Sequence, residues 1–346
     1  MIEFISNYGL FLAKTVTIVV AIAFLASGII STLRRERDSD RERITVKNLN
    51  EFFEDLSKSL TYEMLPAHEQ KKMRKREKKR HKEAAKSGEA ETDSERKRIF
   101  VLNFKGDIAA SAIAALRQEI TAIVSVARPE DEVVLRLESA GGVVNAYGLA
   151  ASQLIRIKKK SIPLTIAVDR VAASGGYMMA CVADKIIAAP FSVLGSIGVM
   201  SELPNFHRLL KKHDIDYEQI TAGEYKRTLT VFGENTDKAR TKFTEQIEDA
   251  HGLFKEFVKH NRPNLDIDTV ATGEYWYGTR AHALNLVDQL ATSDDYLLQL
   301  SQDADVFEVT YKPKETLREK LAAEFEQVVE RLGLKAWTQL EKKRFG

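Results

Sequence analysis

Short runs of β-branched and apolar residues alternate with longer amphipathic segments from residue 98 onward. The apolar runs lie at Ile99–Phe104, Val133–Leu137, Ile162–Val168 and Lys185–Ala188. The helical patterns lie at Ala110–Val126, Val144–Lys158 and Thr236–Arg262, with a shorter one in AHALNLVDQL and a charged amphipathic one at Thr316–Arg344. Strands that alternate with helices favour parallel pairing, so this order predicts an α/β domain with a largely parallel sheet.

A long apolar segment precedes this domain, from Tyr8 to Ile30, and Lys14 is its one charged residue. At about 1.5 Å per helical residue, the segment can cross a hydrocarbon layer of about 30 Å. A cleaved signal peptide is the alternative, but no basic cluster precedes the segment and no A-x-A site follows it cleanly. The pattern therefore predicts a single transmembrane helix in contact with membrane lipid.

The region between the membrane segment and the α/β domain is charged. Five arginines lie between positions 34 and 43, and none precedes the apolar segment, which favours a cytoplasmic position for the following chain. Helical spacing of apolar residues predicts a short amphipathic helix over residues 45–65, which Pro66 ends. Lys71–Lys86 holds ten Lys or Arg residues without interleaved aromatics, which favours a solvated linker over nucleic-acid binding.

The sequence therefore divides into a tail (1–7), a membrane helix (8–30), a tether (31–97), an α/β domain (98–300) and a C-terminal strand and amphipathic helix (301–346). The net charge of +2 indicates no particular partner. Cys181 is the single cysteine, so no internal disulfide forms. Its apolar neighbours, without a nearby histidine, favour a small buried hydrophobic residue over a nucleophile.

Two predicted strand-to-helix turns carry candidate chemistry. Ser174 follows a β-rich run in AASGG, a context similar to a nucleophile elbow, and the Gly175 amide would face a developing oxyanion. A helix-capping serine in a tight turn explains this motif equally well. The strand in LRLES runs into Gly141 and Gly142, whose amides could reach a substrate carbonyl, although a plain β-to-α turn is the alternative. Together the two turns offer both halves of an acyl-transfer site.

A serine hydroxyl needs a base within hydrogen-bond reach. Most of the histidines lie on charged helical faces, which favours surface positions for them. The segment ITAGEYKRTLTVFGENT places Lys226 among apolar and aromatic residues, and burial disfavours the charged form of a lysine. An ordinary solvated lysine is the alternative.

Three segments, ESAGGVVNAYG, VAASGGYMMACVADKIIAAPFSVLGSIGVM and AGEYKRTLTVFGENT, occur in the order in which they resemble the SppA-type signal peptide peptidases. The resemblance covers roughly residues 98–290 and is closest to the short form with one N-terminal membrane helix. It implies a ClpP/crotonase-like fold and a Ser-Lys dyad, with Ser174 as nucleophile and Lys226 as general base. It also implies that Gly142 and Gly175 supply the oxyanion amides and that Ser196 helps to orient the lysine.

The resemblance has further implications. It implies catalysis without a metal or organic cofactor and a ring of identical copies in which a neighbour's lysine completes each site. It also places the domain on the periplasmic face of the inner membrane, against the arginine bias. Two positions depart from the family pattern: Ala140 replaces a proline in the first turn, and Asn285 replaces a glycine near the end of the domain.

The expected substrates are hydrophobic peptides, such as signal peptide remnants or misfolded proteins. Tyr177 and Met178, close to Ser174 in sequence, suggest an apolar groove for them. Two other functions are compatible with the sequence. A crotonase-type enzyme would use paired amides on an acyl-CoA thioester but leave Ser174 and Lys226 without a role, and a membrane-tethered scaffold would bind peptides without cleaving them.

Overall fold

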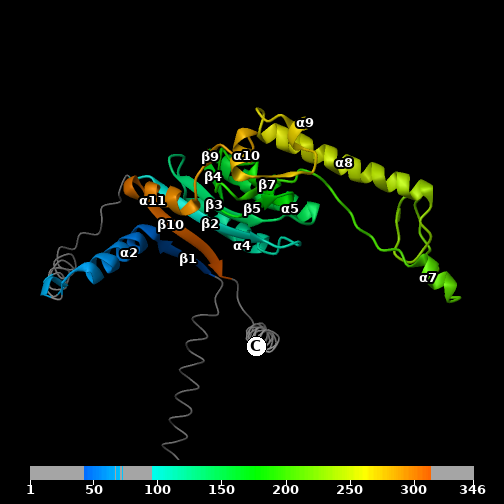
Figure 1. Ribbon diagram of the computed structural model, residues 1–346, viewed down its shortest axis with the longest axis horizontal. Helices are drawn as coiled ribbons and strands as arrows, with labels where there is room; N and C mark the ends of the chain where they lie inside the picture. Colours follow the sequence, from blue (N-terminus) through cyan, green and yellow to red (C-terminus); the bar gives the residue numbers. More distant parts are fainter. Residues whose placement is uncertain (1–42, 67, 71, 73–95, 313–346) are drawn as a thin grey trace, which may run out of the picture. The chain divides into compact units, whose positions relative to one another are not determined.

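The computed structural model describes residues 43–66, 68–70, 72 and 96–312 (Figure 1). The strands of this part of the chain form one sheet, in which seven strands follow the order β1-β10-β2-β3-β4-β6-β9. They are β1 (Arg43–Asn48), β10 (Asp305–Lys312), β2 (Arg98–Gly106), β3 (Glu132–Ser139), β4 (Leu164–Val168), β6 (Lys185–Ala188) and β9 (Gln289–Leu290). From β10 to β9 every neighbouring pair is parallel, which confirms the predicted α/β class.

The sheet divides along β3. The first part of β3 pairs with β4, whereas its last residue, Ser139, pairs with Ala172 of β5 (Val171–Ala173). β5 continues to β7 (Val193–Gly195), and β8 (Tyr275–Tyr277) pairs antiparallel with β7. The branch β5-β7-β8 is therefore a small extension of the main sheet that begins at the carboxyl end of β3.

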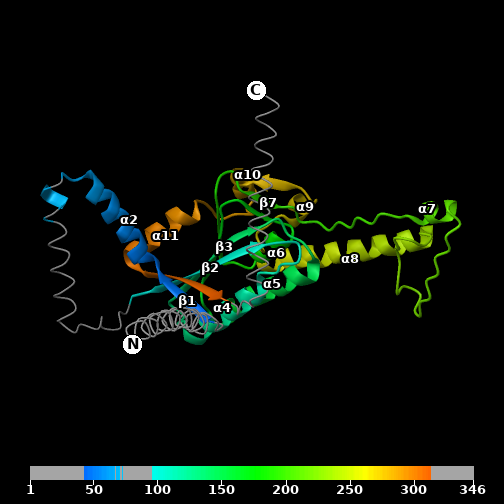
Figure 2. The same cartoon turned by 90° about the horizontal axis from the view of Figure 1, so that it is seen from below.

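Helices cover both faces of the sheet, because the strands are apolar on both sides. Along β2, Phe100 and Leu102 belong to one core with α4 (Ile113–Val126), α5 (Val144–Lys158) and α6 (Gly175–Ala180). The alternate residues Ile99 and Val101 belong to a second core with α2 (Leu49–Met64) and α11 (Ser293–Asp303). Figure 2 shows α5 and α11 on opposite sides of the strands.

The long helix α8 (Asp237–Asn261) begins where the sequence predicts. Thr236 caps it by accepting a hydrogen bond from the Ala239 amide at 3.3 Å. Near its end Phe254 and Val258 are buried in the first core. The shorter helices are α7 (His207–Lys212), α9 (Ile267–Val270) and α10 (Gly278–Ala283).

The N-terminal amphipathic helix starts later than its periodicity predicts. Residues 43–48 form β1 instead, and the Thr45 hydroxyl donates to the Thr310 carbonyl of β10 at 3.1 Å. Asn48 then caps α2. Segments from the expected tether and from the expected C-terminal region thus lie in the same sheet as the central α/β domain.

The predicted transmembrane helix at Tyr8–Ile30, most of the basic run and the predicted helix at Thr316–Arg344 lie outside the described residues. Within the described residues, none of the helices has the length and apolar character needed to span a bilayer.

Candidate active site

Ser174 lies at the sharp turn between β5 and α6. Its φ and ψ are 52° and −120°, a conformation that costs energy for any residue except glycine and that clusters at functional sites. The Ser174 amide donates to the Gly195 carbonyl at 2.8 Å, which ties the turn to the end of β7. Its own carbonyl accepts from the Met178 amide at 2.9 Å and starts α6. The chain thus holds a half-buried serine on a strained strand-to-helix turn.

The second glycine turn packs directly against the first. Gly141 has a φ of +90°, and a side chain there would come within 2.7 Å of the Gly175 nitrogen and 2.8 Å of the Ser174 Cβ. A side chain at Gly142 would overlap the Ile108 carbonyl. Only glycine allows this close approach of the two turns.

A buried chain of hydrogen bonds holds the Gly141 turn in place. The Gly141 amide donates to Ser139 Oγ at 3.0 Å, Ser139 Oγ lies 2.6 Å from the Tyr147 hydroxyl, and that hydroxyl donates to the Asp107 carbonyl at 2.7 Å. Because Tyr147 gives its proton to a carbonyl, Ser139 is the donor between the two hydroxyls. Burial raises the pKa of Tyr147, so this hydroxyl keeps its proton. Bonds that run in one direction strengthen each other.

A pocket of about 540 Å³ opens beside Ser174. Its lining combines the two turns, the segment after β7, part of α8 and the segment before β8, and includes Gly141, Gly142, Ser174, Ser196 and Gly273. In the described part of the chain, the amides of Gly142 and Gly175 make no hydrogen bond. They are therefore free to bind an oxygen of a ligand.

Ser196 lies in this pocket as well, directly after β7. Its φ of 50° is also in the left-handed region, and its amide donates to the Glu274 carbonyl at 2.6 Å. The structure therefore brings together Ser174, both glycine turns and Ser196 from three separate segments of the sequence.

Helix α8 adds a histidine to the pocket. His251 Nε2 lies 3.1 Å from the Ile197 carbonyl, and because a carbonyl oxygen only accepts, we assign a hydrogen to Nε2. His251 is half-buried. Surface positions are expected for most of the histidines, but His251 lines this pocket. The sequence could not show this, because it depends on α8 passing over the segment after β7.

Lys226 does not line the Ser174 pocket. It is exposed and lines a different pocket of about 640 Å³, together with apolar side chains such as Ile220 and Phe232. Among the described residues, no hydrogen bond joins the Lys226 amine to Ser174. One copy of the chain therefore carries the predicted nucleophile and the predicted base in separate pockets.

The location of α7 illustrates this separation. The Phe206 amide, just before α7, donates to the Val231 carbonyl in the Lys226 segment at 2.7 Å. Figures 1 and 2 show α7 at the end of α8 that lies away from the strands.

Comparison with known proteins identifies the family. Two family models match in succession, the N-terminal part of peptidase family S49 at residues 3–154 and peptidase family S49 at residues 156–307. The probable protease SohB of Haemophilus influenzae is 49% identical over 332 residues, which are 94% of each chain. The chain belongs to peptidase family S49. It is a serine peptidase, and the resemblance to SppA-type peptidases that its three motifs indicate is confirmed.

A second SohB protein and a solved structure also match this S49 peptidase. The probable protease SohB of Buchnera aphidicola subsp. Schlechtendalia chinensis is 46% identical over 303 residues, which are 86% of this chain and 99% of that one. A solved structure of a mutant 1510-N membrane-bound stomatin-specific protease, in complex with a substrate peptide, is 15% identical with a TM-score of 0.42. The match covers 67% of this chain and 99% of that one.

Two apolar side chains near Ser174 of the S49 peptidase lie in the core and do not line a substrate groove. Tyr177 is fully buried, and its hydroxyl donates to the Leu286 carbonyl at 3.1 Å, while Met178 is also buried in the core. The expectation that they line a substrate groove was therefore wrong, because α6 turns this face into the sheet. Cys181 is buried too, as predicted, and burial raises the pKa of its thiol to about 12.

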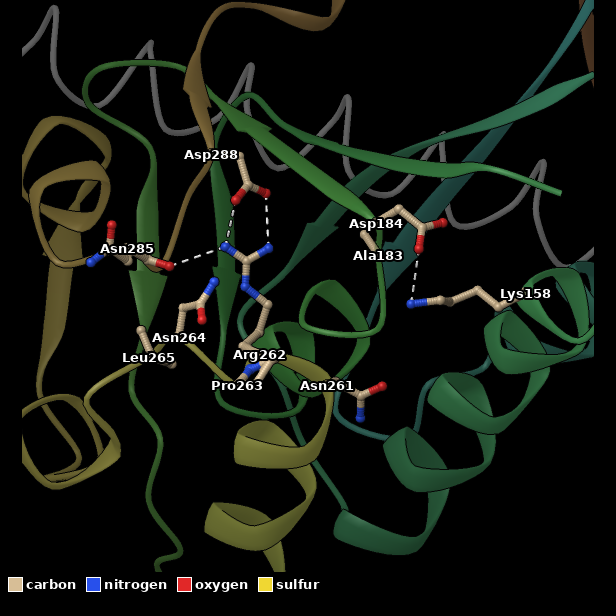
Figure 3. A pocket seen from close by; sticks show the side chains of 10 residues that line it. All are labelled: Lys158, Ala183, Asp184, Asn261, Arg262, Pro263, Asn264, Leu265, Asn285 and Asp288. Carbon is tan, nitrogen blue, oxygen red and sulfur yellow. Dashed lines mark hydrogen bonds and ion pairs between the residues drawn. The ribbon is translucent and has the colours of Figure 1, made fainter. Parts of the chain in front are cut away.

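An ion pair fixes the end of the helix that carries His251 (Figure 3). Arg262, which follows α8, donates to both carboxylate oxygens of Asp288 at 2.6 and 2.8 Å and to the Asn285 carbonyl at 3.1 Å. Burial opposes ionisation of Asp288, but the hydrogen bonds from Arg262 outweigh it and hold the pKa of that carboxyl below its usual value. Asn285 has a φ of 61°, a left-handed conformation that asparagine tolerates better than most residues.

The described residues contain no cluster of three or more His, Cys, Asp and Glu side chains that could hold a metal ion. The polar groups of the Ser174 pocket are instead hydroxyls, backbone amides and one imidazole.

Proposed function

We propose that this S49 peptidase cleaves peptide bonds through a Ser-Lys dyad, with Ser174 as nucleophile and Lys226 as general base. The observation that carries the proposal is the strained turn that places Ser174 in one pocket with Gly142, where the amides of Gly142 and of the adjacent Gly175 make no hydrogen bond to the described residues. The crotonase-type and scaffold functions leave the strained serine without a role.

The reaction follows from these groups. The neutral Lys226 amine accepts the Ser174 proton while Oγ attacks the peptide carbonyl, and the Gly142 and Gly175 amides bind the resulting oxyanion. When the C–N bond breaks, the leaving amine takes the proton from the lysine, which leaves an acyl-enzyme. A water molecule, deprotonated by the same amine, then attacks the acyl carbon. The bond between this carbon and Ser174 Oγ breaks, the lysine returns the proton to Oγ, and the acid product leaves. The family resemblance gives Ser196 the role of orienting the lysine.

We propose that Lys226 acts on the serine of a neighbouring copy in a homo-oligomer. The separate pockets within one chain support this arrangement. The Lys226 segment also exposes large apolar side chains, including Ile220 at 95% and Phe232 at 44% exposure, which is typical of a surface that another chain covers. The ClpP/crotonase-like fold that the motifs imply is part of the same proposal, since its central turns carry the oxyanion amides.

The proposed substrates are hydrophobic peptides, such as signal peptide remnants or segments of misfolded proteins. We propose that residues 8–30 anchor the enzyme in the inner membrane, with its catalytic domain on the periplasmic face. Protease treatment of spheroplasts tests the orientation: a periplasmic domain is digested, whereas the cytoplasmic position favoured by the five arginines protects it.

Labelling with a serine-directed fluorophosphonate tests the nucleophile. We expect the full-length protein to be labelled and Ser174→Ala to remain unlabelled, while labelling of that variant would rule out Ser174. Lys226→Arg should be nearly as inactive as Ser174→Ala, since a guanidinium cannot act as a base at neutral pH. Efficient peptide cleavage by Lys226→Arg would exclude the lysine from its role.

Mixing two inactive variants tests the shared site. In a ring formed from equal amounts of Ser174→Ala and Lys226→Ala chains, about a quarter of the sites combine an intact serine with an intact lysine from the neighbour. We therefore expect the mixture to regain about a quarter of the wild-type activity. A dyad within one chain would leave the mixture inactive.

A further inference from the structure

Strand β8 offers an unpaired edge next to the Ser174 pocket. Its one partner among the described strands is β7. The Ser196 amide donates to the Glu274 carbonyl, and the Gly278 amide donates to the Ser192 carbonyl. Hydrogen-bonded pairs recur every second residue in an antiparallel ladder, so the Trp276 backbone between them faces β7.

The backbone of the two flanking residues therefore faces outward. The amide and carbonyl of Tyr275 and the amide of Tyr277 make no hydrogen bond to another described residue outside their own ladder. An extended peptide finds donors and an acceptor along such an edge, which is the arrangement used in strand addition.

Aromatic side chains flank this edge. Tyr275 and Tyr277 are 58% and 46% exposed, and their rings meet edge to face with centroids 6.1 Å apart. Phe191, 84% exposed, contacts Tyr277 at the same centroid distance. Trp276 points the opposite way, since its ring lies where a side chain at Gly195 would be. Three exposed aromatic rings on one surface form an apolar patch, and such patches are typical of binding sites.

The edge is continuous with the proposed catalytic pocket. A hollow of about 490 Å³ follows β8 and is lined by Gly273, Tyr275, Tyr277 and Arg280 among others. Gly273 also lines the Ser174 pocket. A chain that leaves the Ser174 pocket past Gly273 therefore meets the outer edge of β8 next.

We propose that the outer edge of β8 and its aromatic surface (Phe191, Tyr275 and Tyr277) bind the substrate peptide in extended form, beyond the bond that is cleaved. The proposal rests on the proposed function of Ser174. The strand has three residues, so the edge recognises about three residues of substrate through their backbone and prefers apolar side chains among them. The enzyme thereby selects unfolded or extended apolar segments over folded surfaces.

Two substrates separate this site from catalysis: a long apolar peptide that reaches β8 and a short ester that fills the Ser174 pocket alone. In the full-length enzyme, the double variant Tyr275→Ala, Tyr277→Ala should raise KM for the long peptide about tenfold and leave its kcat unchanged. Hydrolysis of the ester should not change. Leu298→Ala, which removes an exposed apolar residue from α11, is the matched control and should affect neither substrate.

Backbone pairing is tested with a long peptide that carries N-methyl groups on the residues facing β8. This peptide should show a raised KM with the wild-type enzyme. Unchanged KM values for the double variant and for the methylated peptide would overturn the proposal. An equal loss of activity of the double variant toward the ester and toward the long peptide would also overturn it. Loss of binding to phosphatidylglycerol vesicles, or of oligomers, with an unchanged KM would instead assign the surface to lipid or to a second copy. If Ser174→Ala still hydrolyses the ester, the proposed nucleophile fails instead.

Discussion

Replacement of Tyr147 by phenylalanine removes one oxygen from the hydrogen-bond chain behind the Gly141 turn. The hydroxyl is fully buried, accepts from Ser139 at 2.6 Å and donates to the Asp107 carbonyl at 2.7 Å. Two lost hydrogen bonds of about 1 kcal/mol each give a loss of about 2 kcal/mol in the free energy of unfolding. For a domain of this size we expect Tm to fall by about 5 °C.

Activity should fall separately from stability. Ser139 loses its acceptor and no longer holds the Gly141 amide in one position, so the amide of Gly142, the proposed oxyanion donor, shifts. A small misplacement of catalytic groups is costly, and we expect kcat for the short ester to drop about tenfold with KM nearly unchanged. Thermal unfolding and steady-state hydrolysis, both measured well below Tm, give the two values.

Tyr177→Phe is the matched control. Its hydroxyl is equally buried but makes one hydrogen bond, to the Leu286 carbonyl, and touches neither glycine turn. It should lose about 1 kcal/mol of stability and keep its kcat. If Tyr147→Phe loses stability but retains full kcat, the chain does not position the turn. If both variants lose kcat equally, the loss comes from a general destabilisation of the core, and the proposed role of Tyr147 in positioning the Gly141 turn is refuted.

Further predictions concern single contacts. Gly141→Ala introduces strain at a φ of +90° and a contact with the Gly175 nitrogen, so kcat for the ester should fall about 100-fold, whereas full activity would show that the turn adapts. The folded-state pKa of Asp288 is lower than its usual 3.8, so its stabilising effect is complete above pH 3.8 and is lost as the pH falls through the folded value. Asp288→Asn should lower the free energy of unfolding by about 2 kcal/mol at pH 7. Urea titrations should show the difference between wild type and variant becoming smaller in acid, and a difference that does not change with pH would contradict the ion pair. Burial raises the pKa of the Cys181 thiol to about 12, so iodoacetamide should label Cys181 only in the unfolded protein. Rapid labelling of the native enzyme would show that the thiol is not buried.

The parts of the fold that depend on neighbouring residues in the sequence could be predicted. Helix α5 has the bounds that its periodicity gives, Val144–Lys158, and α8 starts after its capping threonine. β1 could not be predicted, because residues 45–48 also fit a helical pattern and become a strand through pairing with β10, more than 250 residues away. The same holds for α11, whose first residue, Ser293, is held by Asp169 through hydrogen bonds of 2.6 and 2.7 Å.

The candidate site shows the same division. The segments AASGG and AGG indicate two turns in the sequence, because tight strand-to-helix turns need small residues. The structure places these two turns side by side. The position of His251 could not be predicted, since it depends on how α8 crosses the segment after β7. The pairing of Arg262 with Asp288 likewise joins residues that no local pattern links.

The division of the sheet at β3 has a consequence for how this enzyme can change over evolution. The main sheet carries most of the buried apolar strand residues, whereas the branch β5-β7-β8 carries the serine turn and ends at an open edge. Sequence drift in β8 and its loops can therefore alter which peptides are accepted at little risk to folding. New specificities would arise on this branch while the central strands stay almost constant.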